Sequence, residues 1–356
     1  DGATVPICTF TVENAHRPDF KGGYVRLSSF RGSENQGPRT KEAIKNTDCG
    51  WFYRASVADF KKIPGSPIAY WVSSRMRNCF ESMPEIRDIE IFRRGIATGD
   101  NALFLRYWFE VGTDNSFICK EPTETKWVKC NKGGEFRKWF GNLEHVINWE
   151  DGGRDILNFK DEKGKLRSRP QNIEYNFKPV ITYSSLTSGT LSVRFFDEKL
   201  INDQSGNFLA LENIELLWKL SSFLNCKLTQ RFLDLLNPTL NVLVEDLNKL
   251  PFDQTIVTKA TLETFKRLHS WAKNDWDSFE TSWDFTSFPL LNPDHRQPTL
   301  KTTYQKLRAH WREMTLEMQR LEQENNRIFI EAYGLQDELT PEVPLNEITL
   351  TCNPHY

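Results

Sequence analysis

The sequence predicts an α+β fold, in which a β-rich part comes first and a helical part with a long C-terminal helix follows. Two observations support this prediction: the spacing of apolar residues changes near residue 205, and the composition is that of a globular chain. With 356 residues, of which 38% are hydrophobic and 26% charged, the chain is long enough to form two domains. We expect a β-rich domain at residues 1–205 and a helical region at residues 206–356.

Short apolar runs in the first part predict β-strands. These runs alternate apolar with polar residues or are rich in aromatic and β-branched side chains, which favours strands over helices. The predicted strands are residues 23–27, 51–54, 68–72, 103–111, 180–183 and 191–195. Long connecting segments separate them, and long loops in compact domains commonly bind ligands.

Helical spacing replaces this pattern after Gly206. Apolar residues three and four positions apart predict two antiparallel helices between residues 209 and 235. A third helix is expected at about residues 254–274. A long helix should follow at about residues 299–333, because Gly334 is a typical residue at the end of a helix.

The overall charge limits the kinds of partner that the chain can attract. Lysine and arginine number 46 and aspartate and glutamate 48, so the net charge is −2 and no chain-wide positive field draws in nucleic acid. A nucleic-acid surface would therefore have to be a local patch. The seven cysteines are scattered without a C-x-x-C pair, which argues against a disulfide framework or a zinc site and favours the cytoplasm.

No segment predicts a membrane span or a secretion signal. The longest apolar region, residues 208–224, is interrupted by Glu212, Glu215 and Lys219. The sequence starts at Asp1 without a methionine, and we interpret it as a segment of a larger protein.

A glycine turn at residues 94–101, RGIATGDN, carries the most distinctive chemistry. Gly95 and Gly99 permit backbone angles that other residues avoid, so the turn can direct consecutive amides at phosphate oxygens. A related turn, SSLTSG, occupies residues 184–189. Either turn could instead be an ordinary hairpin connection.

Two basic segments lie between these turns. Residues 126–140 interleave lysine and arginine with aromatic residues, and residues 160–169 become basic towards their end. Basic side chains supply phosphate contacts, and arginine also fits guanine in the major groove. The alternatives are an amphipathic hairpin over buried tryptophans and a solvated charged face.

From these segments we predict a surface that binds double-stranded DNA, partly through base edges and partly through phosphates. The predicted DNA-binding residues are Arg93, Arg94, Thr98, Asn101, Lys126, Lys132, Arg137, Lys165, Arg167, Arg169, Tyr183, Ser184 and Arg194. We expect no catalytic residue, because the sequence has no P-loop, no G-x-G-x-x-G motif and no recognisable triad. The CNPHY end at residues 352–356 departs from the Asn-Pro-Pro-Tyr signature of adenine methyltransferases at His355, and we interpret it as a chance similarity.

Several longer phrases are spread over nearly the whole chain. They are DFKKIPGSPIAYWV (59–72), GIATGDN (95–101), NKGGEFR (131–137), NW (148–149), ITYS (181–184), NPTL (237–240), DWDSFETSWD (275–284) and YGLQDEL (333–339). Together they resemble the C-terminal, target-recognising part of the adenine-specific DNA methyltransferase of BREX phage-defence systems, the PglX family. The GIATGDN phrase also resembles recognition domains of fused type II restriction-modification enzymes.

The resemblance implies a parent enzyme that transfers a methyl group from S-adenosylmethionine to adenine N6 in host DNA, which marks that DNA as self. The cofactor-binding and catalytic motifs of the family lie in a preceding methyltransferase domain. We therefore expect no cofactor in this segment and no activity from it alone. The partners that the resemblance implies are double-stranded DNA, the missing N-terminal methyltransferase domain and other BREX components.

Two further expectations concern protein partners. A positive surface would make acidic phage proteins that imitate DNA plausible inhibitors. A second hypothesis, from a different class, is a protein-interaction scaffold within the defence complex. The Trp311 and Met314 stripe on the long helix supports it.

Overall fold

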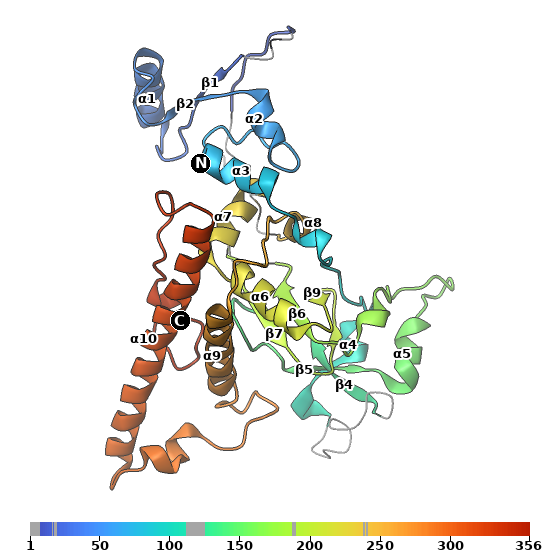
Figure 1. Cartoon of the computed structure of the whole chain (residues 1–356). Coiled ribbons are helices and arrows are strands. Elements are labelled where there is room, and N and C mark those ends of the chain that lie inside the picture. Colours follow the sequence, from blue (N-terminus) through green and yellow to red (C-terminus); the bar gives the residue numbers. More distant parts are fainter. Residues whose placement is uncertain are drawn as a thin grey trace. The chain divides into compact units, whose positions relative to one another are not determined.

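A computed structural model describes residues 8–15, 17, 20–111, 125–186, 190–237, 239 and 241–356. The chain divides into two compact units, Asp1–Glu81 and Ser82–Tyr356. Both helices and sheets are present (Figure 1), so the predicted α+β class is confirmed. The domain boundary expected near residue 205 remains a prediction.

The first unit is built around a two-stranded ribbon. Strand β1 (Gly22–Val25) pairs antiparallel with β2 (Phe52–Ala55), close to where the sequence predicts strands. Its helices are α1 (Ser33–Lys45), α2 (Val57–Lys61) and α3 (Ser74–Ser82), the last of which ends at the unit's boundary. Stacking of Tyr70 on Tyr24, with ring centroids 4.6 Å apart, joins the loop before α3 to the ribbon.

The strand predicted at residues 68–72 is wrong. This segment forms successive turns, in which Ala69 N donates to Pro67 O and Val72 N donates to Ala69 O. Pro67 removes one backbone donor at the start of the run, and local turns satisfy the following amides. The aromatic residues that suggested a strand pack locally instead: the guanidinium of Arg26 lies 4.2 Å from the ring centroid of Trp71.

The second unit contains two sheets. The four-stranded sheet has the order β3 (Leu105–Tyr107), β5 (His145–Asn148), β4 (Trp127–Asn131) and β8 (Ile201–Asn202). The three-stranded sheet has the order β7 (Val193–Phe196), β6 (Val180–Ser184) and β9 (Gly206–Ala210). Neighbouring strands are antiparallel except β4 and β8.

The strand predicted at residues 103–111 exists only in part. Residues Asn101–Phe104 form the short helix α4, because the side chain of Asp100 accepts a hydrogen bond from Leu103 N and caps its start. Strand β3 covers the next three residues, and Trp108–Glu110 form a 3-10 turn, η2. Side-chain capping therefore overrides the apolar pattern at both ends of the predicted strand.

The helices follow the predicted spacing more closely. They are α5 (Glu150–Leu157), α6 (Ile214–Leu224), α7 (Lys227–Leu236), α8 (Val244–Asn248), α9 (Lys259–Trp276) and α10 (Leu300–Ala332). The side chain of Thr299 caps α10 and Tyr333 ends it, which confirms the predicted long helix. The helical stripe predicted from residue 209 begins too early, because Leu209 lies in β9 and Asn213 caps α6.

The core of the second unit lies where helices cover the three-stranded sheet. All residues of β6, β7 and β9 are buried, so both faces of this sheet are covered. Helix α6 packs on β7 and on α9, and α9 packs in turn on α10; Figure 1 shows this succession of layers. Strand β6 precedes residue 205 in the sequence and strand β9 follows it. The two strands pair, so the three-stranded sheet contains residues from both sides of residue 205.

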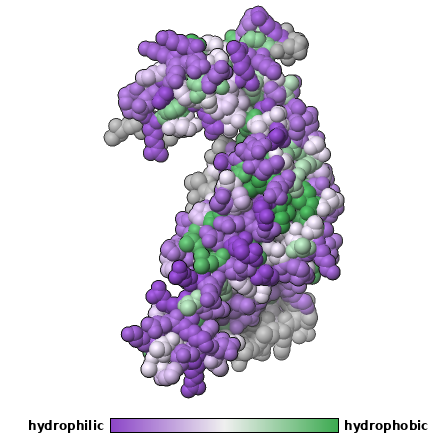
Figure 2. Space-filling view, turned by 60° about the vertical axis from the view of Figure 1, so that its left-hand side comes forward, coloured by the Kyte–Doolittle hydropathy of each residue, from purple (hydrophilic) through white to green (hydrophobic). Residues whose placement is uncertain are grey.

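The face of the molecule that Figure 2 displays is mostly polar. Hydrophilic side chains cover most of the face that Figure 2 displays, and hydrophobic side chains gather in a few areas of it. Among the helices of the described residues, none combines the length and the apolar character that crossing a membrane requires.

One core residue links stability to pH. The His269 ring lies among Phe140, Phe195 and Phe265, and its Nε2 is 3.1 Å from Phe195 O. Burial lowers the pKa of His269 from 6.5 to about 4. Between these values the unfolded chain binds more protons than the folded chain, so acid favours unfolding.

We predict that the free energy of unfolding decreases as the pH falls from about 6.5 to about 4. A pKa shift of this size corresponds to roughly 3 kcal/mol. His269→Gln should reduce this pH dependence, because the amide keeps a donor near Phe195 O but does not titrate. Urea unfolding at the two ends of this pH range measures the effect. An unchanged pH dependence in the His269→Gln protein would contradict the assignment.

Candidate nucleic-acid interface

The glycine turn at residues 95–101 is held from two sides by backbone contacts. Ile96 N donates to Asn202 O at 2.7 Å, and Gln204 N donates to Ile96 O at 3.0 Å. On the other side Ala97 and Arg169 form a bridge with bonds of 3.1 and 2.7 Å. The turn is therefore the point at which the β8–β9 connection and the 160–171 segment meet.

Close approach explains both glycines of this turn. A Cβ added at Gly95 would lie 2.2 Å from Asn202 O and 2.3 Å from Asp203 O. Gly99 has a φ of +81°, and a Cβ there would lie 2.8 Å from the carbonyl carbon of Arg167. Side chains would push both neighbouring segments away from the turn.

The 160–171 segment presents its arginines to solvent. Arg167 and Arg169 are exposed, whereas Ser168 between them is buried and donates to Ile156 O at 2.6 Å. Residues two apart in an extended segment point to the same side. The two arginines therefore share a face, and Arg167 is steadied by the Phe159 ring, 4.9 Å away.

Two more cations border this face. Lys165 is exposed in the turn before Arg167, and its backbone is fixed by a 2.8 Å bond between Asp161 N and Lys165 O. Arg94 is exposed at the start of the glycine turn, where Asn172 Nδ2 donates to its carbonyl at 3.0 Å. We call Arg94, Lys165, Arg167 and Arg169 the basic rim.

Three other predicted residues are accessible in part. Asn101 is exposed, and its Oδ1 accepts a 2.6 Å hydrogen bond from Thr98 Oγ1. Lys126 is exposed and pairs with Glu150 at 2.9 Å. Lys132 is half-buried and has no ion pair within the ranges that the structure describes.

The structure corrects the prediction for Thr98, Arg137, Tyr183, Ser184 and Arg194. These residues are between 0% and 7% exposed, so their side chains do not project from the surface as the prediction required. Arg93 also has a structural role, because its side chain is only 11% exposed and pairs with Glu90 at 2.8 Å. Its guanidinium carbon lies 3.8 Å from the ring centroid of Tyr175. Of the related turn at 184–189, residues 187–189 lie outside the described residues.

Arg137 is the centre of a buried network that the sequence did not reveal. Its Nη2 lies 2.7 Å from Asp275 Oδ2, and its Nη1 donates to Thr351 Oγ1 at 2.9 Å. The same carboxylate accepts from Thr351 N at 2.6 Å and from Cys352 N at 3.0 Å. The ion pair therefore joins three parts of the chain that are far apart in sequence.

Glu322 on α10 anchors Lys138 and Trp139, the two residues that follow Arg137. It pairs with Lys138 Nζ at 2.8 Å and accepts from Trp139 Nε1 at 2.8 Å. The basic aromatic segment at 126–140 is consequently an interior element from residue 137 onwards. In the sequence, the only sign of this interior role is the alternation of cations with tryptophans. The same alternation is equally typical of a binding loop that faces solvent.

A second buried cluster joins the two sheets. Asn131 Nδ2 is 2.6 Å from Thr182 Oγ1, 2.9 Å from Asn202 Oδ1 and 3.2 Å from Gly206 O. Burial also raises the pKa of Asp203, which adjoins this cluster. Among the described residues, no three His, Cys, Asp or Glu side chains are arranged to hold a metal ion.

Comparisons with known proteins give a consistent picture. No protein-family model matches the chain. It is 35% identical over 96% of its length to the adenine-specific methyltransferase PglX of Lacticaseibacillus casei strain Zhang, and 30% identical over 100% to the adenine-specific methyltransferase BrxX of Escherichia coli O9:H4 strain HS. The resemblance predicted from the sequence is thus confirmed. The chain spans 29% and 28% of the length of these relatives.

A solved structure of the type IIL restriction-modification enzyme MmeI in complex with DNA is also similar. It has 12% sequence identity and a TM-score of 0.41, over 73% of this chain and 34% of that one.

We predict that Gly95→Ala lowers the free energy of unfolding by about 1–3 kcal/mol or more, since the added methyl group overlaps backbone oxygens. Urea unfolding followed by circular dichroism measures this change. Gly37→Ala adds the same methyl group where nothing lies within 4 Å and should not destabilise the protein. A Gly95→Ala protein as stable as the parent would show that the turn is not packed as described.

We predict that Asp275→Ala lowers the free energy of unfolding by about 3–5 kcal/mol, because it leaves the buried Arg137 charge without a partner. Glu150→Ala removes the partner of Lys126 in an exposed pair and should cost less than about 1 kcal/mol. The same unfolding measurement compares the two variants. Equal losses would contradict the structural role of the Arg137–Asp275 pair.

Proposed function

We propose that this chain recognises double-stranded DNA and serves as the target-recognition part of an adenine-specific DNA methyltransferase used in phage defence. Similarity over nearly the whole chain to two proteins named adenine-specific methyltransferases supports this function. The chain spans under a third of their length. We therefore assign methyl transfer, and the S-adenosylmethionine that supplies the methyl group, to parts of such an enzyme that these residues do not span.

The basic rim is the observation that carries the proposal. Within the described residues, Lys165, Arg167 and Arg169 have no carboxylate within ion-pair distance, and Arg94 has only a 3.4 Å contact with Glu245. Cations without protein partners are available to displace counterions from a DNA backbone. Arginine can also donate two hydrogen bonds to a guanine edge in the major groove.

Rigid support makes these side chains effective. The backbone around them is tied by the Ala97–Arg169 bridge and by Gln171 Nε2, which donates to Gly95 O at 2.8 Å. A surface that is ordered before binding loses less conformational entropy when a duplex docks. Residues such as Arg137 and Thr98 contribute by holding this frame in place and do not contact DNA.

DNA binding by this chain would help a methyltransferase to expose its target base. An enzyme that methylates adenine must rotate the base out of the duplex, which costs a few kcal/mol of stacking and pairing. A rim that grips phosphates on either side of the target can contribute part of that energy. The accessible residues in this function are Arg94, Asn101, Lys126, Lys132, Lys165, Arg167 and Arg169.

We predict that the triple variant Lys165→Gln, Arg167→Gln, Arg169→Gln binds a labelled pool of random duplexes about tenfold more weakly or worse, since each lost phosphate contact weakens binding to every sequence alike. The slope of log affinity against log salt should become shallower by about 0.9 for each DNA phosphate that the variant no longer neutralises. Fluorescence anisotropy at several salt concentrations measures both quantities.

A matched control removes the same charge elsewhere. Lys266, Arg267 and Arg320 on α9 and α10 pair with Glu263 and Glu317, and changing these three cations to glutamine should leave affinity and slope nearly unchanged. Equal effects of both triple variants would refute a role for the basic rim. No affinity of the parent chain for DNA at low salt would instead favour the scaffold hypothesis.

A further inference from the structure

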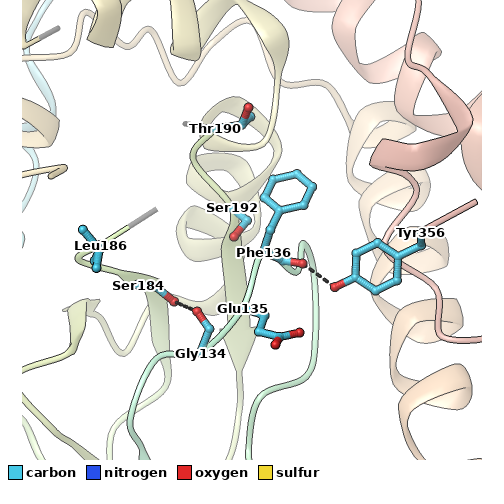
Figure 3. Close-up of a pocket in the computed structure, with 8 residues that line it drawn as sticks. All are labelled: Gly134, Glu135, Phe136, Ser184, Leu186, Thr190, Ser192 and Tyr356. Carbon is cyan, nitrogen blue, oxygen red and sulfur yellow. Dashed lines mark hydrogen bonds between the residues drawn. The ribbon is translucent and has the colours of Figure 1, made fainter. Parts of the chain in front are cut away.

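A pocket lies beside the C-terminal end of β6. Its volume is about 450 Å³. The lining residues, shown in Figure 3, are Gly134, Glu135, Phe136, Ser184, Leu186, Thr190, Ser192 and Tyr356. The pocket thus combines four hydroxyl groups with two aromatic rings and one carboxylate.

Arg194 lies directly behind the wall of this pocket. Thr182 pairs with Arg194 and Tyr183 with Val193 across β6 and β7, which places Ser184 and Ser192 on the same face of the sheet as Arg194. The Arg194 Nη2 donates to Ser184 Oγ at 3.3 Å, and Nη1 donates to Arg137 O at 3.3 Å. Its Nε has no hydrogen-bond partner among the described residues.

The charge of Arg194 is uncompensated in the described part of the chain. Its side chain is 0% exposed, and no carboxylate of a described residue lies within 4 Å of it. The neighbouring Arg137 shows the contrast, because its charge is matched by Asp275 at 2.7 Å. Burying a cation without a counter-charge is unfavourable, and an anion bound nearby would offset that cost.

The hydroxyl groups of the pocket can serve such an anion. Ser192 Oγ accepts a 3.2 Å hydrogen bond from Arg137 N, so its own hydrogen points away from that bond. Ser184 and Tyr356 already donate, to Gly134 O and Phe136 O respectively, and hold the wall together (Figure 3). Ser192 is only 3% exposed, but its hydroxyl lines the pocket and donates to no described residue, so it can donate to a ligand that enters.

We propose that this pocket binds a phosphate group, with Arg194 as the buried counter-charge and Ser192 as a direct hydrogen-bond donor. A DNA backbone phosphate and the phosphate of a free nucleotide share this chemistry. Binding of a DNA backbone phosphate rests on the proposed function, whereas binding of a free nucleotide does not. Glu135 opposes the phosphate, but its carboxylate is exposed, so water screens it more effectively than it screens the buried arginine.

Two variants of lining residues test the proposal without removing the buried cation. Ser192→Ala should weaken binding about fivefold to tenfold, and Glu135→Gln should strengthen it by a similar factor. Ser278→Ala, which removes a hydroxyl in the turn that follows α9, outside the pocket, is the matched control. Circular dichroism confirms that each variant is folded.

Two kinds of probe, small phosphate compounds and duplex DNA, distinguish the source of the phosphate. Inorganic phosphate and adenosine monophosphate are titrated by calorimetry, and a labelled duplex pool is titrated by anisotropy. A backbone phosphate is supported if Ser192→Ala weakens duplex binding and Glu135→Gln strengthens it, each by the same factor for all sequences. The same pattern with the small probes alone supports a free phosphate ligand, even if the parent chain binds no DNA. Unchanged affinity for every probe in both variants overturns the proposal.

Discussion

The buried ion pair between Arg137 and Asp275 is the constraint on which the second unit depends. Two charges removed from water are tolerated only when geometry and further hydrogen bonds satisfy them, and here Thr351 and Cys352 complete the shell of the carboxylate. The pair fixes the segment after β4 against the end of α9 and against the C-terminal residues at once. Any change in the position of one of these three parts would leave a charge in the interior without its partner.

This constraint makes the helices part of the frame beneath the loops. Glu322 on α10 adds a second tie through Lys138 and Trp139, and α6 and α9 cover the sheet that carries Ser184 and Arg194. The phrases NKGGEFR and DWDSFETSWD, on which the resemblance to the methyltransferase family was based, contain Arg137 and Asp275. Two of the phrases that carried the resemblance therefore include the two residues of this buried pair.

Local pattern predicted the elements that local forces decide. The ribbon β1–β2, the strands β6 and β7 and the long helix α10 follow from alternation, helical spacing and capping at Thr299. The prediction for Arg137 failed because its partner is a carboxylate 138 positions away, which leaves no trace in the local pattern. The prediction for Arg194 failed because the sequence does not show that both faces of its strand are covered. The strand at 68–72 failed for a local reason, since turns that begin at Pro67 override the apolar run. For the candidate site, the sequence located the glycine turn and the basic rim, but it could not separate cations that solvent reaches from cations that a carboxylate neutralises.

For attracting an anionic partner, the difference between exposed cations and cations paired with a carboxylate matters more than the net charge of −2. Lys126, Lys138 and Arg93 each face a carboxylate, so they contribute little field outside the protein. Lys165, Arg167 and Arg169 have no such partner among the described residues and lie on one fixed edge, so their field extends into solvent at short range. Arg194 is a third kind of cation, unmatched but enclosed, whose field acts through a hydroxyl-lined pocket. A chain that is nearly neutral in total can attract an anionic partner because its compensated charges cancel in place and its uncompensated ones do not.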